Sequence, residues 1–120
     1  LDHFFFFGYF LEGKLVGFYT MLLNGSVLET YFLGYDAKVQ KENMLYLNML
    51  YNMTAYGIEN GYKKIIFGRT ALEIKSSIGA IPVNMSGFIY HNNKFIDNYI
   101  GQLFKKLEPT LHWQPRNPFK

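Results

Sequence analysis

The fold is decided by residues 67–80, Phe67-Gly68-Arg69-Thr70-Ala71-Leu72-Glu73-Ile74-Lys75-Ser76-Ser77-Ile78-Gly79-Ala80. The apolar run Ile65-Ile66-Phe67 leads into this stretch and predicts a strand that ends where the stretch begins. A short helical segment is expected next, and Gly79 is expected to end it. Because ligands dock at the carboxyl ends of strands in α/β sheets, Arg69 and Lys75 are candidates for binding an anion.

Three strands are predicted at the start of the chain, over residues 4–11, 15–23 and 27–34. Asn24-Gly25 between two apolar runs is the strongest short signal for a hairpin, and Gly13 supplies turn geometry between the first two strands. Strands joined by such short turns pair antiparallel. The sequence therefore predicts a three-stranded antiparallel meander.

A long helix is predicted over residues 39–60, because apolar side chains recur there at helical spacing. The side chains that carry this pattern are Tyr46, Met49, Leu50, Met53, Tyr56 and Gly57. Asp36 is the expected N-cap, and Asn60-Gly61 is the expected end. A strand over residues 63–67 follows, and the crossover through a helix predicts that it runs parallel to the third strand.

A further strand and a last helix are predicted after the central stretch. Residues 81–90 read as a strand with a bend near Ser86-Gly87, and Pro82 places the start of this strand at a sheet edge. Residues 94–107 form an amphipathic helical pattern that Pro109 ends. We interpret the apolar stripe of this helix as core packing, and docking on a partner or a membrane surface is the alternative.

Length and composition bound the function classes. The 120 residues suffice for a single mixed domain of class α+β over residues 1–120. There is no cysteine, and the three histidines lack the spacing of metal ligands, so we expect no metal site. The lack of cysteine also fits a reducing compartment, so we expect the protein in the cytoplasm. The net charge of +3 comes without a dense basic stripe, which disfavours nucleic-acid binding, and no apolar run reaches the length of a transmembrane segment. Because the chain opens at Leu1 directly into a strand, we expect it to be the C-terminal part of a longer protein.

The predicted order of elements resembles the later part of the GNAT acyltransferase fold. Leu33-Gly34-Tyr35-Asp36 and the segment 59–70 are similar to GNAT-like domains related to the Fem-type peptidoglycan-bridge aminoacyltransferases. The Fem-type turn carries a Phe-Lys-x-x-Phe-Gly pattern, which Ile74-Lys75-Ser76-Ser77-Ile78-Gly79 matches at its Lys and its final Gly. The similarity spans residues 13–80, and it implies that the first strand and helices of the full fold are absent from this chain.

This resemblance implies an N-acyltransferase that moves an acetyl, other acyl or aminoacyl group onto an amine. The donor would be acetyl-CoA, another acyl-CoA or an aminoacyl-tRNA, and the acceptor a small-molecule or cell-wall-precursor amine. The family's glycine-rich pyrophosphate loop is replaced here by residues 36–43, which contain no glycine. The alternative is a non-catalytic GNAT-like module for binding or dimerisation, with a homodimer formed by sheet pairing.

The candidate site residues follow from the strand ends and from this resemblance. They are Leu33, Gly34, Tyr35, Lys38 and Lys41 for the donor cofactor, Arg69 and Thr70 for the substrate, and Lys75 and Glu73 for catalysis. Simpler interpretations remain open for three of them. Arg69 can instead form a salt bridge with Glu73, Lys75 can be a solvated helix lysine, and Glu73 can be an exposed carboxylate.

Other polar side chains were considered for acid–base or nucleophilic roles. Tyr35 or Tyr90 is a candidate proton donor to a leaving thiolate. His91, at the end of a predicted strand, is a candidate base, and a surface histidine is the alternative. Ser76 and Ser77 have no histidine and acid nearby in the pattern, so a nucleophilic triad is not predicted.

Overall fold

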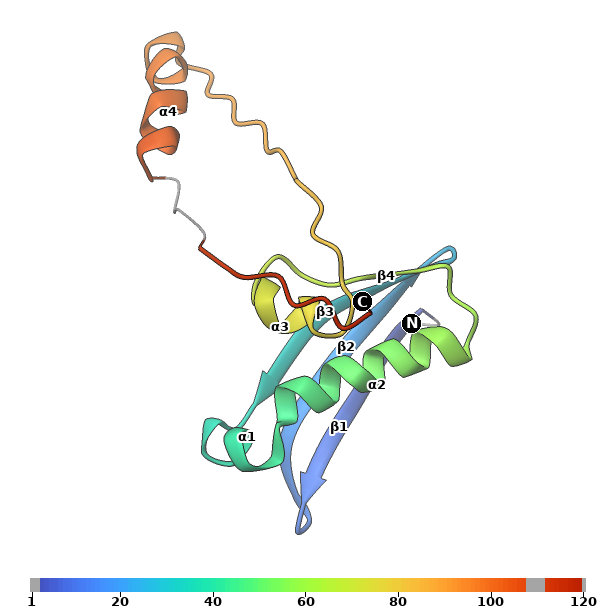
Figure 1. The fold of residues 1–120 in the computed structure, drawn as a ribbon. Coiled ribbons are helices and arrows are strands. Elements are labelled where there is room, and N and C mark those ends of the chain that lie inside the picture. Colours follow the sequence, from blue (N-terminus) through green and yellow to red (C-terminus); the bar gives the residue numbers. More distant parts are fainter. Residues whose placement is uncertain (1–2, 108–111, 120) are drawn as a thin grey trace.

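The computed structural model, which describes residues 3–107 and 112–119, opens with an antiparallel meander. Strands β1 (Phe4–Leu11), β2 (Lys14–Asn24) and β3 (Val27–Tyr35) pair in that order (Figure 1). Gly13 (φ 78°) and Gly25 (φ 60°) form the two turns in the left-handed region, where glycine avoids a steric cost. The predicted meander is confirmed.

The helix predicted over residues 39–60 is wrong as one element, because the chain forms α1 (Ala37–Asn43) and α2 (Leu45–Glu59). Met44, between them, adopts φ 46° and ψ 39°. A left-handed residue cannot continue a right-handed helix, so the helix axis changes direction there. Apolar periodicity does not register a single left-handed residue, which explains the error.

The predicted ends of this helical region are confirmed. The Asp36 carboxylate accepts a hydrogen bond from the Lys38 N–H at 2.9 Å, which caps α1. Helix α2 ends with Asn60 as its C-cap, and Gly61 follows at φ 68°. After this end of α2, the chain returns to the sheet as β4 (Lys64–Ile66).

Strand β4 extends the sheet to the order β1-β2-β3-β4 and runs parallel to β3, as predicted. The pairing is short: Val27 lies opposite Lys64, Leu28 opposite Ile65 and Glu29 opposite Ile66. The observed class is a mixed α+β fold with a four-stranded sheet.

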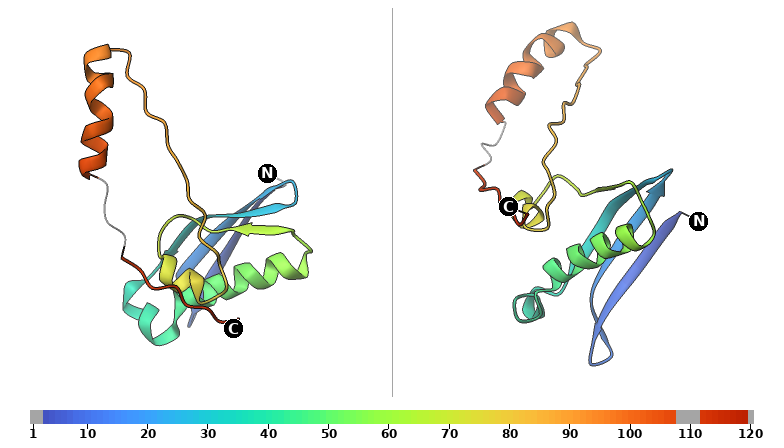
Figure 2. Two further views of the ribbon diagram at one scale, coloured as in Figure 1. Left: turned by 45° about the horizontal axis from the view of Figure 1, so that its top comes forward. Right: turned by 45° about the vertical axis from the view of Figure 1, so that its right-hand side comes forward.

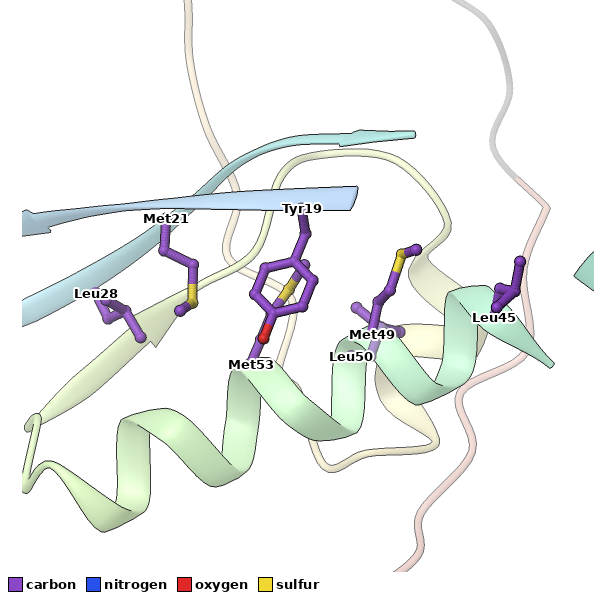
Figure 3. Close-up of a cluster of buried hydrophobic side chains, with 7 residues drawn as sticks. All are labelled: Tyr19, Met21, Leu28, Leu45, Met49, Leu50 and Met53. Carbon is purple, nitrogen blue, oxygen red and sulfur yellow. The ribbon is translucent and has the colours of Figure 1, made fainter. Parts of the chain in front are cut away.

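The hydrophobic core lies between α2 and one face of the sheet (Figure 3). All of its members are at most 5% exposed, and they are Tyr19, Met21, Leu28, Leu45, Met49, Leu50 and Met53. Gly57 lets the helix approach closely, since a Cβ there would lie 2.8 Å from Ile65 Cγ1. The methionines predicted on α2 thus fill the core.

Among residues 3–107 and 112–119, no helix lies on the opposite side of the sheet, which we call the bare face (Figure 2, right). Its side chains alternate with those that face α2, and on β1 and β2 they include Phe4, Phe6, Phe10, Leu15, Phe18 and Leu22. Phe6 stacks on Phe18 with ring centroids 5.4 Å apart. Phe6, Phe10 and Leu15 are 59%, 68% and 53% exposed.

After α3 (Leu72–Ser76) the structure departs from the sequence prediction. Residues 81–90 are extended but form no strand, and α4 (Lys94–Leu107) buries none of its residues. The predicted strand and the predicted core packing of the last helix are therefore wrong, because no sheet edge or groove within the described residues receives them. Pro109, predicted to end α4, lies outside the described residues.

Residues 81–107, which we call the arm, leave the domain at α3, and the chain returns to α3 in residues 112–119 (Figure 1). The Ala80 N–H donates to the Lys75 carbonyl, and the Arg116 N–H donates to Ser76 Oγ at 2.8 Å. The radius of gyration is 18.1 Å, whereas a compact chain of this length has about 14 Å. The arm thus projects from a smaller packed unit.

Alkaline pH is expected to destabilise the core through Tyr19. Burial, with smaller contributions from Tyr9 and Tyr56, raises the pKa of Tyr19 from 10.0 to about 12. Its stabilising contribution is complete below pH 10 and is lost as pH rises through 12, because the unfolded tyrosine ionises first. Tyr19→Phe should reduce the loss in unfolding free energy at pH 12 by about 2 kcal/mol, as measured by urea titration.

Tyr31 and Lys75 also bear on the interpretation of that pH experiment. Tyr31→Phe is the matched control, since Tyr31 is exposed and lies outside the core, and it should leave the alkaline loss unchanged. Burial lowers the pKa of Lys75 from 10.5, so its effect has the opposite sign and stabilises as pH rises through the lowered pKa. An alkaline loss equal in Tyr19→Phe and in the unmodified chain would contradict the assignment.

Candidate functional site

The site begins where β3 and β4 separate. Their pairing stops after Glu29 and Ile66, while β3 continues to Tyr35 and the chain beyond β4 turns into α3. From Thr30 onward, the outer edge of β3 therefore has no strand beside it within the described part of the chain. Unpaired main-chain N–H and C=O groups on such an edge can bind an extended ligand.

A β-bulge shapes this edge. The register between β2 and β3 shifts between Tyr19 and Met21, so that Tyr31 and Phe32 both lie opposite Thr20. The Thr20 hydroxyl fastens the bulge, because it accepts from the Phe32 N–H at 2.8 Å and donates to the Phe32 carbonyl at 3.2 Å. Bulges redirect side chains, and here Tyr31 and Phe32 are both exposed at the opening between the strands.

A cavity of about 540 Å³ fills the opening between β3 and α3. Its lining comes from three places: β3 and its bulge, helices α1 and α2, and the loop and helix after β4. The residues are Thr30, Tyr31, Phe32, Leu33, Tyr35, Gln40, Tyr46, Leu50, Met53, Phe67, Gly68, Thr70, Ala71, Ile74 and Lys75. No Asp, Glu or His is among these described lining residues, so the wall combines apolar, aromatic and uncharged polar groups with one cation.

Lys75 is that cation, and it is only 7% exposed. Its Nζ donates to the Gly68 carbonyl at 2.6 Å and to the Thr70 carbonyl at 2.7 Å. The interpretation as a solvated helix lysine is therefore wrong. Lys75 fastens α3 to the loop at the end of β4, and burial lowers its pKa. Its positive charge lies in the cavity wall.

Glu73 lies outside the cavity and is exposed, as the simpler interpretation expected. It forms an ion pair with Arg116 at 2.6 Å, and the predicted alternative of an Arg69–Glu73 salt bridge is wrong. Arg69 is exposed at the end of β4, and within the part of the chain that the structure describes it forms no ion pair. The Glu73 carboxylate, which sequence spacing assigned to Arg69, thus pairs with Arg116 near the C-terminus.

The predicted donor residues divide between the cavity and its surroundings. Leu33 and Tyr35 line the cavity, whereas Gly34 lies on the bare side, where a Cβ would meet the Phe18 ring. Lys38 and Lys41 are exposed on α1 and are not part of the lining.

Of the predicted substrate residues, Thr70 lines the cavity and Arg69 does not. At the start of α1, the Asp36 carboxylate already accepts a hydrogen bond from the Lys38 N–H. An anion bound there would meet a like charge. The two lysines of α1 therefore stay a prediction for phosphate contacts made by side chains alone.

Tyr46 is a site residue that the sequence reasoning missed. It lines the cavity beside Tyr35, with ring centroids 6.0 Å apart. Burial, with a smaller contribution from Tyr35, raises the pKa of Tyr46, so its hydroxyl holds its proton at neutral pH. Its place on the apolar stripe of a helix concealed this role, and no local motif distinguishes it from a core aromatic.

The remaining candidates are not among the described residues that line the cavity. Tyr90 belongs to the arm and is exposed. His91 lies just before α4, where its Nδ1 accepts from the Asn93 N–H at 3.0 Å and its own N–H donates to the Asp97 carboxylate at 3.1 Å. Ser76 and Ser77 donate to carbonyls one turn earlier on α3. None of the four therefore has an observed place in the candidate site.

Two other kinds of site were sought in residues 3–107 and 112–119. These residues contain no cluster of three or more His, Asp or Glu side chains that could hold a metal ion. None of their helices combines the length and apolar character needed to cross a membrane.

Comparison with known proteins gives a structural likeness only. No family model matches the sequence, and no curated protein matches it. Two solved structures match, both of an aminoglycoside acetyltransferase from an uncultured soil metagenomic sample. The complex with trehalose has a TM-score of 0.51 at 16% identity, and the complex with sisomicin has 0.50 at 17%. Each match covers 98% of this chain and 64% of the other.

This likeness bears on the fold. The chain has a GNAT-like fold, as the order of its elements predicted, and it spans about 64% of the length of the matched acetyltransferase. At such identity the two proteins share an architecture, and function depends on the residues of the site.

Proposed function

We propose that the chain is an N-acyltransferase domain that transfers an acyl group from acyl-CoA, with acetyl-CoA as the first candidate, to an amine. The observation that carries the proposal is the cavity at the point where β3 and β4 separate. The matched structures, which are named as acetyltransferases, support the same reading.

The residues of the opening fit the amide-bearing arm of an acyl-CoA. The unpaired edge of β3 from Thr30 to Tyr35 offers main-chain donors and acceptors to an extended chain of amides. Leu33 and Phe67 provide apolar contacts beside it. The phosphates would rely on Lys38 and Lys41, because the Asp36 carboxylate occupies the start of α1.

The cavity can support acyl transfer by position and charge. Bound acyl-CoA would supply a thioester, whose C–S bond breaks as the amine nitrogen forms a bond to the carbonyl carbon. Lys75 places a positive charge near the negative charge that develops. The Tyr46 hydroxyl donates a proton to the leaving sulfur and regains one through water from the amine nitrogen. With no carboxylate among the described lining residues, the amine must arrive unprotonated or lose its proton to water.

Binding of the donor is the primary test. Acetyl-CoA at millimolar concentration should raise the melting temperature of the chain, and desulfo-CoA should do so to a similar extent. Turnover with a panel of amines can be followed with a thiol-reactive dye, because the chain has no cysteine that would react. Absence of both a thermal shift and CoA release would overturn the proposal.

Tyr46→Phe tests the proton donor. We expect kcat to fall about 10²-fold, the lower end of the range for general acid catalysis, with KM for the donor unchanged. Tyr51→Phe is the matched control, because Tyr51 lies on the same helix, is half exposed and does not line the cavity. An equal effect in both variants would assign Tyr46 a structural role.

The finer alternatives concern the donor, the acceptor and the setting. The Fem-type pattern at residues 74–79 favours an aminoacyl-tRNA donor and a cell-wall-precursor amine in a cytoplasmic setting. Charged tRNA can be tested in the same assay, and transfer of a labelled amino acid to an amine would select this donor over acyl-CoA. Arg69 and Thr70 remain proposed contacts to the acceptor, and their alanine variants should raise KM for the amine.

A non-catalytic GNAT-like module is the second candidate function. It is favoured by one observation, the lack of an acidic or histidine side chain among the described residues that line the cavity. A thermal shift with acetyl-CoA but no CoA release with any amine would select it.

A further inference from the structure

The arm carries two exposed apolar surfaces, one on α4 and one on the extended residues 81–90. Helix α4 carries an apolar stripe whose exposed members are Phe95, Ile96, Tyr99, Leu103, Phe104 and Leu107. Residues 81–90 are extended and carry exposed apolar side chains, with Phe88 99% exposed. Within the described residues, no backbone hydrogen bond joins residues 81–90 to another segment. An apolar stripe and a strand-like segment both exposed to water mark a contact surface.

The bare face is a matching surface of the same chemistry. Its exposed members are aromatic and aliphatic, and it lies on paired strands to which a helix can pack. The 14 residues of α4 span about 21 Å at 1.5 Å per residue, which fits along the 11 residues of β2. Neither surface has a partner within the described residues.

The arm does not place α4 on the bare face of the same molecule. Ile74 and Ile78 anchor α3 on the side of the sheet where α2 lies. The arm leaves from there in the direction away from the bare face, and α4 stands clear of the sheet in every view (Figure 2). Both ends of the excursion are tied to α3, by the Ala80 and Arg116 hydrogen bonds. A second molecule can receive the helix without rearranging these anchors.

We propose that α4 of one copy packs its apolar stripe on the bare face of a second copy, and that the exchange is reciprocal. Covering six large side chains that are each between 46% and 81% exposed removes roughly 600 Å² from water, since one aromatic side chain buries about 150–250 Å². Two such contacts, with similar areas on the sheets, bury roughly 2,400 Å² in total, which is enough for a stable dimer.

Cysteine trapping tests the exchange, because the chain has no native cysteine. In the double variant Phe10→Cys with Leu103→Cys, mild oxidation should yield a covalent species of twice the 14.1 kDa chain mass on a non-reducing gel. A crosslink that stays within one chain would overturn the proposal in favour of folding back. A covalent dimer from Leu103→Cys alone, at the same yield, would overturn it in favour of helix-to-helix pairing.

Sedimentation of the chain gives an independent readout. We expect a dimer at 50 µM, a monomer for Leu103→Asp and a monomer for Phe10→Asp. Gln102→Asp, on the polar side of α4, should remain a dimer. Circular dichroism distinguishes a folded monomer from an unfolded variant, and both altered side chains are more than half exposed, so the fold should persist. A monomeric unmodified chain at this concentration, or a dimer in Phe10→Asp, would contradict the exchange.

Discussion

Replacing Lys75 with methionine should lower the unfolding free energy by about 2–3 kcal/mol, since the two hydrogen bonds lost involve a charged group and leave two carbonyls unpaired. Methionine keeps the length and apolar stem of the side chain, so the change removes mainly the ammonium. The Gly68 and Thr70 carbonyls lose their donor, and α3 loses its tie to the end of β4. Urea denaturation followed by circular dichroism measures this loss.

The same variant should reduce acyl transfer more than it reduces stability at the assay temperature. The loop from Gly68 to Thr70 forms part of the cavity wall, and the charge of Lys75 faces the site of bond breaking in the proposed mechanism. We expect at least a 10²-fold fall in kcat, an effect of the size seen when one stabilising donor is removed. Lys63→Met, which removes an exposed lysine near β4, should change neither quantity. Full activity in Lys75→Met would confine Lys75 to a structural role.

Patterns local in sequence predicted the first half of this fold correctly. Turn glycines and alternating apolar residues specify the meander, and helical spacing specifies α2, because each is a property of a few neighbouring residues. The break at Met44 has no such local signal, since methionine is a good helix former and only the packing of α1 and α2 selects its left-handed conformation.

The errors in the second half come from contacts between distant residues. Glu73 pairs with Arg116, 43 residues away, and a spacing argument naturally chose Arg69 instead. Residues 81–90 have the composition of a strand, but a strand also needs a free edge within reach. Composition alone could not reveal that residues 81–90 pair with no strand in the described part of the chain, and the exposure of the arm follows from this.

The candidate site was predictable in position but not in detail. The strand end after Phe67 and the neighbouring Leu33 and Tyr35 do line one cavity. The bulge at Tyr31 and Phe32 and the inward place of Tyr46 depend on register and helix orientation, which no motif in the sequence carries.

Leu28→Ala should lower the unfolding free energy by about 3–4 kcal/mol, within the range measured for buried leucines. Leu28 is fully buried and lies where three elements meet: β3, the facing residue Ile65 of β4, and α2 at Gly57. Deleting its side chain leaves a cavity that neighbouring backbone cannot close. Because β3 and β4 pair at only three positions, the loss also loosens the strand separation that forms the candidate site.

Ile58→Ala supplies the comparison, as an aliphatic side chain on α2 that is 72% exposed. It should change the unfolding free energy by less than about 0.5 kcal/mol, as expected for surface substitutions. Chemical denaturation of both variants measures the difference, and thermal shift with acetyl-CoA shows whether the opening survives in Leu28→Ala. Equal effects of the two substitutions would mean that the core does not lie between α2 and the sheet, and the position of the cavity would have to be reassigned with it.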